Sequence, residues 1–344
     1  MPEHNAPDLF AFGLGHATRS QANTVLDSWF PAPLVNLDAA LSSAIRKIAS
    51  IGVSEIDSST TTAIAQALDA AGQVEAAKLA NALADTGKGV TCVALEQDAP
   101  ITSTPEAYLK LHLMSHRLCL PNTLNLDGIF AHLPTVAWTN KGPMDPADVP
   151  QAIIKARASG DALHVRSLDK FPQMADYVLP AGVRIANSAR VRLGAFVGDG
   201  TTVMHEGQIN FNSGALGPNM VEGRISQGVI LGANTDLGGG ASTMGTLSGG
   251  GTQRVSVGEN CLIGANGGTG IPLGDRCTIE AGLYITAGSV VRLFDADGDS
   301  RQIKARELAG ASDLLFIRHS ATGEVQCRTN RSAIELNDAL HAHN

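Results

Sequence analysis

Aliphatic side chains recur at every sixth position through much of the second half of the chain. The first run contains Ile185, Val191, Val197, Val203, Ile209, Ala215 and Val221, with Gly and small or polar residues between them. The spacing resumes in new phases at Leu231 and Leu237, at Val257 and Ile263, and at Leu273, Ile279, Ile285 and Val291. Neither the helical period of about 3.6 residues nor the alternation of a single strand produces such a repeat. A short internal period with Gly at the turns predicts a solenoid.

Each six-residue repeat is interpreted as one short, flat strand whose aliphatic residue points inward, while Gly, Asn and Asp form the corners. Stacked coils then bury an aliphatic column. The pattern resembles that of the hexapeptide-repeat acyltransferases, which implies a left-handed parallel β-helix, here over residues 183–293, and assembly into homotrimers. A right-handed β-helix or a β-sandwich is the weaker alternative, because a sandwich shows turn signals roughly every 8 to 12 residues.

The six-residue period breaks at a glycine-rich segment, residues 238–254. From Gly238 to Thr252 it reads GGGASTMGTLSGGGT. An insertion of this kind must leave the coil as a loop, and insertions in solenoids commonly build the binding face.

The N-terminal part shows mixed helical and extended patterns. Asn36 is the candidate N-cap of the first helix, and Gly72 marks a candidate helix break. Ser103 and Glu106 have the spacing of a capping box. The predicted elements are a helix over 36–48, two helices or one broken helix over 60–85, a strand over 90–95 and a helix over 104–117.

These patterns predict a mainly β protein with an α/β N-terminal domain and a small C-terminal cap. Prolines at 134, 143, 146 and 150 are typical of a linker. The predicted boundaries are 1–140 for the N-terminal domain, 141–182 for the linker, 183–293 for the β-helix and 294–344 for the cap. Within the cap we expect strands over 314–318 and 324–328 and a helix over 332–342.

Composition excludes several classes of protein. The formal net charge of −8 and the pI near 5.7 argue against a general nucleic-acid binder, although a local cluster of Arg can still bind a small anion. The five cysteines are widely spaced without a CxxC pair, so neither a disulfide framework nor a zinc site is expected. The sequence has no apolar stretch of about 18 residues and no signal-peptide pattern, so we expect a cytoplasmic protein without membrane contact. Rossmann and P-loop glycine motifs are absent.

Charged residues inside the repeats point to chemistry. The segments are Met204-His205-Glu206-Gly207, then Val221-Glu222-Gly223-Arg224-Ile225-Ser226, the glycine-rich insertion, and Gly264-Ala265-Asn266-Gly267-Gly268. In this order, over about residues 184–320, they closely resemble the tetrahydrodipicolinate N-succinyltransferase family. The resemblance implies transfer of a succinyl group from succinyl-CoA to the amine of L-2-amino-6-oxopimelate, the hydrated form of tetrahydrodipicolinate, in lysine and diaminopimelate biosynthesis.

The resemblance assigns Glu222 as the catalytic carboxylate, described in the family as an acyl-anhydride nucleophile. The chemistry equally allows Glu222 to act as a general base on the incoming ammonium. A structural alternative is an ion pair with Arg224 on the same side of one strand. Arg224 also suits bidentate recognition of a carboxylate, as do Arg184, Arg190 and Arg192.

Other site residues follow from the family match. It assigns Gly245 a backbone N–H for the oxyanion, a role that a glycine loop performs without side-chain bulk. Lys304, Arg306 and Arg318 are candidates for phosphate or carboxylate contacts, although basic residues on a cap are often merely solvated. The cofactor-binding positions implied by the match are Arg224, Gly239, Ser242, Ala265, Glu280, Ala281, Gly288, Lys304 and Arg318.

Two alternatives involve the first charged segment. His205 is a candidate base if the chain is instead a CoA-dependent N-acetyltransferase of an amino acid or sugar. Glu206 matches a family position that holds a divalent ion such as Mg²⁺, but the accompanying family Asp falls near Ala189. Solvation or pairing with Arg190 or Arg192 also explains Glu206.

The predicted protein is therefore a homotrimeric, cytoplasmic succinyltransferase acting on small molecules, with active sites between subunits as the family implies. A non-enzymatic scaffold, or a zinc protein similar to γ-carbonic anhydrases, is a third hypothesis. The zinc version requires several converging His ligands, and only His205 lies within the repeats.

Overall fold

The computed structural model describes residues 8–249, 252–295 and 299–329. The chain forms two compact units. Unit 1 contains the residues up to 119, 123–172 and 176–178, and unit 2 contains 120–122, 173–175 and the residues from 179 onward.

Unit 1 is built on an antiparallel sheet with the strand order β2-β1-β5-β4, and β3 also pairs with β1. Along β1 the side chains alternate between the two faces. Phe12 and Leu14 pack into the core beneath the helices. On the other face, an added Cβ would lie 2.9 Å from the Phe30 ring at Gly13 and 1.7 Å from the Trp29 backbone oxygen at Gly15. The elements are β1 (Ala11–Arg19), β2 (Val25–Trp29), β3 (Leu34–Val35), α1 (Ala39–Ile48), β4 (Gly52–Ile56), α2 (Ser58–Ala70), α3 (Val74–Asp85), β5 (Val90–Leu95) and α4 (Thr104–Ser115).

The helix ends follow local chemistry. The predicted cap at Asn36 is wrong, because α1 is capped by Asp38, whose side chain accepts from Leu41 N at 2.8 Å. The region 60–85 forms two helices, and Gly72, at φ 76°, lies in the turn between them. Ser103 caps α4 as predicted, while the Glu106 carboxylate accepts from Thr102 N.

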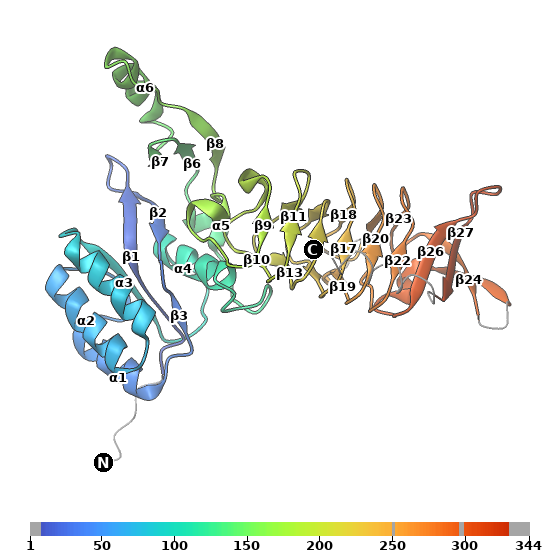
Figure 1. Cartoon of the computed structure of the whole chain (residues 1–344), viewed down its shortest axis with the longest axis horizontal. Coiled ribbons are helices and arrows are strands. Elements are labelled where there is room, and N and C mark those ends of the chain that lie inside the picture. Colours follow the sequence, from blue (N-terminus) through green and yellow to red (C-terminus); the bar gives the residue numbers. More distant parts are fainter. Residues whose placement is uncertain (1–7, 250–251, 296–298, 330–344) are drawn as a thin grey trace. The chain divides into compact units, whose positions relative to one another are not determined.

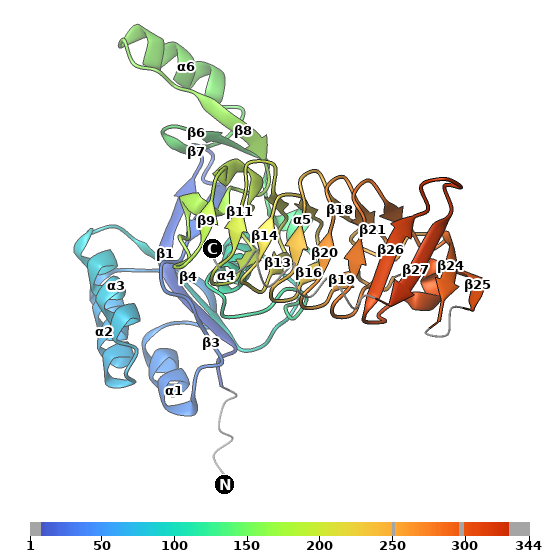
Figure 2. The same cartoon turned by 45° about the vertical axis from the view of Figure 1, so that its right-hand side comes forward.

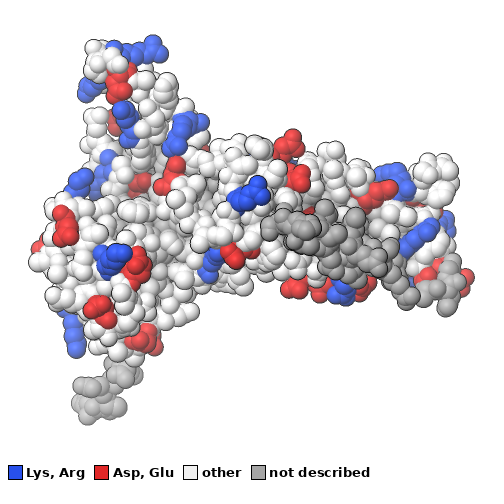
Figure 3. Space-filling view, viewed as in Figure 1, with Lys and Arg blue, Asp and Glu red and all other residues white. Residues whose placement is uncertain are grey.

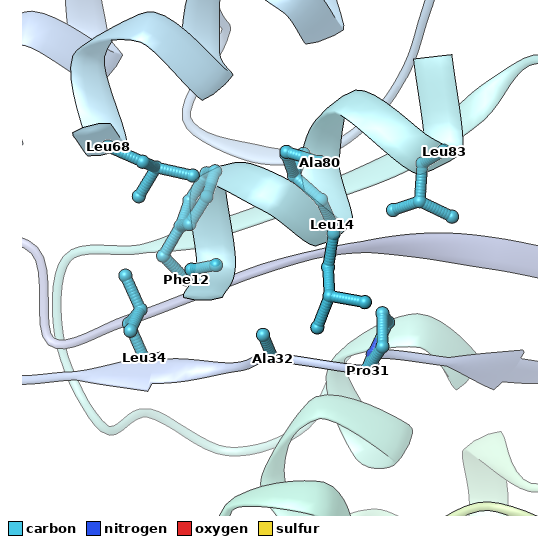
Figure 4. A pocket seen from close by; sticks show the side chains of 10 residues that line it. Phe12, Leu14, Pro31, Ala32, Leu34, Leu68, Ala80 and Leu83 are labelled. Atoms are coloured by element: carbon cyan, nitrogen blue, oxygen red, sulfur yellow. The ribbon is translucent and has the colours of Figure 1, made fainter. Parts of the chain in front are cut away.

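A small apolar cavity of about 10 Å³ lies between β1 and the helices α2 and α3. Figure 4 shows the side chains of Phe12, Leu14 and Leu68 around it. A cavity of this size holds at most one water, and all of the side chains that line it are apolar. It is a packing imperfection of the core and not a ligand site.

The segment predicted as a linker is not irregular. It contains β7 (Gly142–Met144), α6 (Val149–Ala158) and β8 (Val165–Asp169), preceded by α5 (Ile129–His132) and β6 (Val136–Thr139). The strands form a small antiparallel sheet in the order β7-β6-β8. Pro143 lies in the edge strand β7 and Pro150 in the first turn of α6, which are positions that tolerate proline.

Unit 2 is a stack of coils whose short strands form three parallel sheets (Figures 1 and 2). The first contains β10 (Ala195–Val197), β13 (Ser213–Ala215), β16 (Ile230–Leu231) and β19 (Ser256–Val257). The second, called the site sheet below, contains β12 (Gln208–Ile209), β15 (Arg224–Ile225), β18 (Ser242–Thr243), β21 (Gly268–Thr269) and β23 (Tyr284–Ile285). The third contains β9 (Arg184–Ile185), β11 (Thr202–Val203), β14 (Met220–Val221), β17 (Asp236–Leu237), β20 (Leu262–Ile263) and β22 (Thr278–Ile279). This is a parallel β-helix.

The predicted aliphatic column forms the core of the stack. Val203, Ile263 and Ile285 are fully buried, and so are most other members of the six-residue pattern. At one corner, Asn234, Asn260 and Arg276 adopt left-handed φ values of about 56°, which turn the chain sharply after each coil. The inward positions were therefore predicted correctly from their spacing.

The cap consists of β24 (Val290–Phe294), β25 (Ser300–Lys304), β26 (Leu314–Arg318) and β27 (Val325–Thr329). β26 pairs in parallel with β22, so the cap continues the third sheet. Arg276 also forms a two-pronged ion pair with Asp313, at 2.6 and 2.8 Å. The predicted strand over 314–318 is present, the next begins one residue later than predicted, and the helix predicted over 332–342 lies outside the described residues.

On the face drawn in Figure 3, basic and acidic side chains are interspersed on both units. Among the helices described in the structure, none is long and apolar enough to cross a membrane.

His112 lies in a buried aromatic group of unit 1. Its Nδ1 lies 2.7 Å from Tyr108 O, and Phe30 N donates to its Nε2 at 3.3 Å. Both bonds are made only by the neutral ring that carries its proton on Nδ1. Burial lowers the pKa of His112 to about 3.

Acidification is therefore expected to destabilise unit 1 below the ordinary histidine pKa of about 6.5. Folded His112 stays neutral down to about pH 3. Between about pH 6.5 and pH 3, only the unfolded state therefore binds a proton on this histidine, and the free energy of unfolding decreases as the pH is lowered. Between pH 7 and pH 4, the free energy of unfolding should decrease by about 2–3 kcal/mol more for wild type than for His112→Gln. Urea unfolding followed by tryptophan fluorescence measures this difference. An equal dependence of the free energy of unfolding on pH in the two proteins would contradict this explanation.

Candidate active site

The site sheet presents one outward row of residues, each directly before an inward one. The inward residues Ile225, Thr243 and Ile285 are buried. Because side chains alternate along a strand, their predecessors face outward. The strand pairings align this row as Gln208, Arg224, Ser242, Gly268 and Tyr284.

Three side chains of this row are joined by hydrogen bonds across successive coils. Arg224 Nη2 donates to Ser242 Oγ at 3.0 Å, and Ser242 Oγ lies 3.2 Å from the Tyr284 hydroxyl. The Tyr284 ring reaches Ser242 by crossing Gly268, where an added Cβ would lie 2.3 Å from the ring. The guanidinium of exposed Arg224 is thus oriented by a chain of two hydroxyls.

One edge of the site sheet is a corner that repeats in successive coils. Glu222, Gly239, Ala265 and the pair Glu280–Ala281 all lie between a strand of the third sheet and a strand of the site sheet. The sequence-predicted residues therefore form a column, which we call the first corner.

Backbone contacts hold the first corner together. A carboxylate oxygen of Glu222 lies 3.6 Å from the position that a Cβ on Gly239 would take, so Glu222 reaches toward the next coil. Asn266 N donates to Gly239 O at 2.9 Å, and Arg318 N donates to the Glu280 carboxylate at 2.6 Å. The column thus runs from Glu222 to the cap residue Arg318.

The opposite edge of the site sheet, the second corner, carries the glycine-rich insertion. Val255 N donates to Gly245 O at 3.2 Å, which closes the base of the loop. Ser248 N donates to Gly270 O, and Ser248 Oγ accepts from Ala287 N at 2.6 Å, so the loop lies along the following coils.

Gly288 and the basic cap residues lie at the same edge. Val290 in β24 pairs with Lys304 in β25, and Arg306 Nε donates to Ala287 O at 3.4 Å. Gly288, Lys304 and Arg306 are exposed. The predicted cofactor residues therefore border the site sheet on both sides, with the positive charges at the cap end.

The ion pair between Glu222 and Arg224, the structural alternative to a catalytic role for Glu222, is absent from the part of the chain that the structure describes. Glu222 lies in the corner before β15, while Arg224 lies within β15 and bonds to Ser242. The premise that both residues share one strand face was wrong, because the strand contains only two residues.

His205 and Glu206 lie in the first corner, one coil before Glu222, and both are exposed. Arg190 Nη2 donates to the backbone oxygen of Glu206 at 2.7 Å, not to its carboxylate. Within residues 8–249, 252–295 and 299–329, no three His, Cys, Asp or Glu side chains are grouped closely enough to hold a metal ion.

Sequence reasoning missed Tyr284 and Ser248. Tyr284 immediately precedes the inward Ile285, as Arg224 precedes Ile225, so the six-residue phase contained the signal that would have found it. Ser248 had no such signal, because its contacts depend on how the insertion folds back over the coils.

The arrangement combines a partly exposed carboxylate, an oriented guanidinium and a glycine loop along one sheet of hexapeptide coils. These groups can move a proton, hold an anionic group and donate backbone N–H groups to a developing oxyanion. Residues 254–287 match the hexapeptide repeat of succinyl-transferase family. Fold and site together define an acyltransferase of the hexapeptide-repeat class.

Comparison with known proteins identifies the family within this class. The chain is 52% identical to the 2,3,4,5-tetrahydropyridine-2,6-dicarboxylate N-succinyltransferase of Pseudomonas putida, covering 98% of this chain and 99% of that protein. The protein of the same name from Vibrio cholerae is 50% identical over 97% and 99% of the two chains. This chain therefore belongs to the 2,3,4,5-tetrahydropyridine-2,6-dicarboxylate N-succinyltransferase family.

The likeness extends through unit 1. A Campylobacter jejuni structure, provisionally named a 2,3,4,5-tetrahydropyridine-2-carboxylate N-succinyltransferase, superposes with a TM-score of 0.88 at 29% identity, covering 97% of this chain and 95% of that one. Residues 133–173 match the tetrahydrodipicolinate N-succinyltransferase middle family. This segment includes much of the stretch that the sequence had predicted to be a linker.

Gly268 is predicted to be required by close packing in the site sheet. A Cβ there would lie 2.5 Å from the backbone oxygen of Ser242 as well as against the Tyr284 ring. Gly268→Ala is therefore expected to destabilise the β-helix by about 1–3 kcal/mol, measured as a lower melting temperature by circular dichroism. Gly288→Ala is the matched control, because an added Cβ there meets nothing within 4 Å. Equal melting temperatures would refute the packing argument.

Proposed function

We propose that the chain transfers the succinyl group of succinyl-CoA to the amine of L-2-amino-6-oxopimelate, in lysine and diaminopimelate biosynthesis, on the surface of the site sheet. The observation that carries this assignment is the position of Glu222 in the first corner, two residues before Arg224, whose guanidinium is linked through Ser242 to Tyr284. The names and full-length coverage of the curated relatives support the same reaction.

In the proposed complex, CoA lies along the site sheet between its two corners. Gly239, Ala265, Ala281 and Gly288 have little or no side chain, so their backbone groups are open to close approach by a ligand. Lys304 and Arg318 are exposed and suited to anionic groups of the cofactor. The hydroxyl chain that orients Arg224 favours a fixed geometry for a carboxylate or phosphate contact.

Transfer requires the acceptor ammonium to lose a proton before its nitrogen attacks the thioester carbonyl. In the first proposed route, Glu222 takes this proton and the amine attacks the carbonyl. The C–S bond then breaks, the departing CoA thiolate takes the proton from Glu222, and the amide nitrogen releases its second proton to solvent. In the second, the Glu222 carboxylate attacks the thioester carbonyl, and the C–S bond breaks to give an acyl anhydride and the CoA thiolate. The thiolate takes the proton of the acceptor ammonium, and the free amine opens the anhydride, releasing its second proton to solvent. Both routes produce the same amide and regenerate the carboxylate.

Gly245 is proposed to stabilise the oxyanion of the tetrahedral intermediate. Among the described hydrogen bonds, none engages the Gly245 N–H, and the residue is partly exposed beside the site sheet. A backbone donor that is already fixed in position stabilises the transition state without reorganisation.

The proposed assembly is a cytoplasmic homotrimer of left-handed β-helices with active sites between subunits. The proposed division of the chain is an N-terminal domain over 1–140, a connecting segment over 141–182, a β-helix over 183–293 and a cap over 294–344. A divalent ion such as Mg²⁺ at Glu206, a family position on the trimer axis, would be held by one carboxylate from each subunit, because Ala189 offers no side-chain oxygen there. No step of the proposed reaction involves a metal.

Replacing Glu222 tests the reaction and the catalytic assignment together. Thiol release from succinyl-CoA, with L-2-aminopimelate as a stable acceptor, is expected to fall by a factor of about 10² to 10⁴ in Glu222→Ala, because either proposed route needs the carboxylate. Acetyl-CoA should be a poorer donor for wild type.

His205→Ala is the discriminating variant, since His205 lies in the same corner and is the candidate base of an N-acetyltransferase. It is expected to retain most of the activity. Loss of turnover in His205→Ala but not in Glu222→Ala would move the catalytic role to the histidine. Absence of turnover by wild type with succinyl-CoA would refute the proposed reaction.

A further inference from the structure

Unit 1 contains a pocket that is lined by none of the residues proposed for acyltransfer. Its volume is about 570 Å³, large enough for a small organic molecule, and it is lined by residues of β2 and of the small β7-β6-β8 sheet together with Asp176 and Tyr177. β2 and β7 contact each other, which brings these elements together within the unit (Figure 1). The glycine-rich loop and Glu222 belong to unit 2.

The pocket wall is strongly aromatic. Trp29, Trp138 and Tyr177 line it, and the rings of Trp138 and Tyr177 meet edge to face with centroids 6.4 Å apart. The indole N–H groups bond to backbone oxygens, that of Trp29 to Tyr177 at 3.1 Å and that of Trp138 to Asp169 at 3.0 Å. Both indoles are thus held in position by bonds at their edges. Aromatic faces of this kind attract cations.

The charged residues of the wall are Asp27, Asp176 and Arg166, so the wall carries one carboxyl group more than it carries basic groups. Arg166 and Asp176 form an ion pair at 2.9 Å and offset each other. Asp27, only 6% exposed, has its described hydrogen bonds from neutral donors, namely Thr18 N at 3.1 Å and the Tyr177 hydroxyl. A buried carboxylate without a cationic partner is unfavourable. Burial accordingly raises the pKa of Asp27.

An anionic ligand fits this wall poorly. It would have to displace Asp176 from Arg166 while lying near Asp27. A neutral aromatic ligand would leave Asp27 without a compensating charge. A cation that carries N–H groups offsets the charge of Asp27 and can also lie against the indole and phenol rings.

We propose that this pocket is a binding site for a small organic cation that carries a primary ammonium group, which pairs with Asp27 and packs against Trp29, Trp138 and Tyr177. The site shares no lining residue with the set proposed for acyltransfer. It does not rest on the reaction proposed above.

The chain contains only two tryptophans, and both line the pocket, so its intrinsic fluorescence reports on this site. The full-length protein is titrated with n-butylammonium chloride at constant ionic strength. We expect a saturable change in tryptophan emission with a dissociation constant on the order of millimolar, as befits so small a ligand. Sodium butyrate and sodium chloride should produce no saturable change.

Variants test the assigned contacts. Asp27→Asn keeps an oxygen that accepts from Tyr177 but removes the charge, and is expected to weaken butylammonium binding at least about tenfold. Asp85→Asn, which removes an exposed carboxylate from α3, is the matched control and should bind like wild type. Glu222→Ala should also retain the full response, which separates this site from the acyltransfer site.

Trp29→Leu provides a second test that leaves the buried carboxylate intact. With Trp138 as the remaining reporter, it should weaken binding about threefold, because one aromatic face is lost. Linear, unsaturable quenching by butylammonium would overturn the proposal. An equal response to butyrate, or unchanged affinity in both Asp27→Asn and Trp29→Leu, would overturn it too.

Discussion

The aliphatic column inside the β-helix is the constraint on which the site depends. Every coil must place its inward residues directly above those of the coil below, because the apolar surface is buried only when the coils stay in register. A shift of one residue would turn Ile225 or Ile285 outward and bury Arg224 or Tyr284 instead. The burial of the aliphatic residues therefore fixes the outward row, and the chain of hydroxyls that orients Arg224 is a consequence of core packing.

The same register explains why residues far apart in the sequence form one surface. Glu222, Gly239, Ala265 and Ala281 each follow a strand of the third sheet, so the stack aligns them without any direct attraction between them. The glycine-rich insertion interrupts the six-residue period but not the stack, since Ser242 and Gly268 remain paired across it. A solenoid can thus carry functional residues on an insertion while its core continues unchanged. Unit 1 has a separate core and a separate pocket.

Much of this architecture could be predicted from spacing alone. The inward residues, the insertion, two helices separated at Gly72 and the cap strand over 314–318 follow from periodicity and turn chemistry. The cap of α1 could not be decided locally, because Asn36 and Asp38 are equally good N-cap types and packing selects between them. Pro143 and Pro150 predict a linker from the sequence alone, but an edge strand and the first turn of a helix also accept proline. The contact of Ser248 with Ala287 depends on the path of the insertion, and the sequence of the insertion has no six-residue repeat from which that path could be predicted.

The central claim is that coil register assembles the two corners and the site sheet into a single cofactor surface. Hydrogen–deuterium exchange of the full-length protein with and without CoA tests it most directly. Addition of CoA is expected to slow exchange in peptides covering 238–248, 264–268 and 280–288. Exchange should not change in the corner at 232–234 and 258–260, because this corner lies on another edge of the stack. Protection of that other corner, or of the first corner without the second, would contradict it.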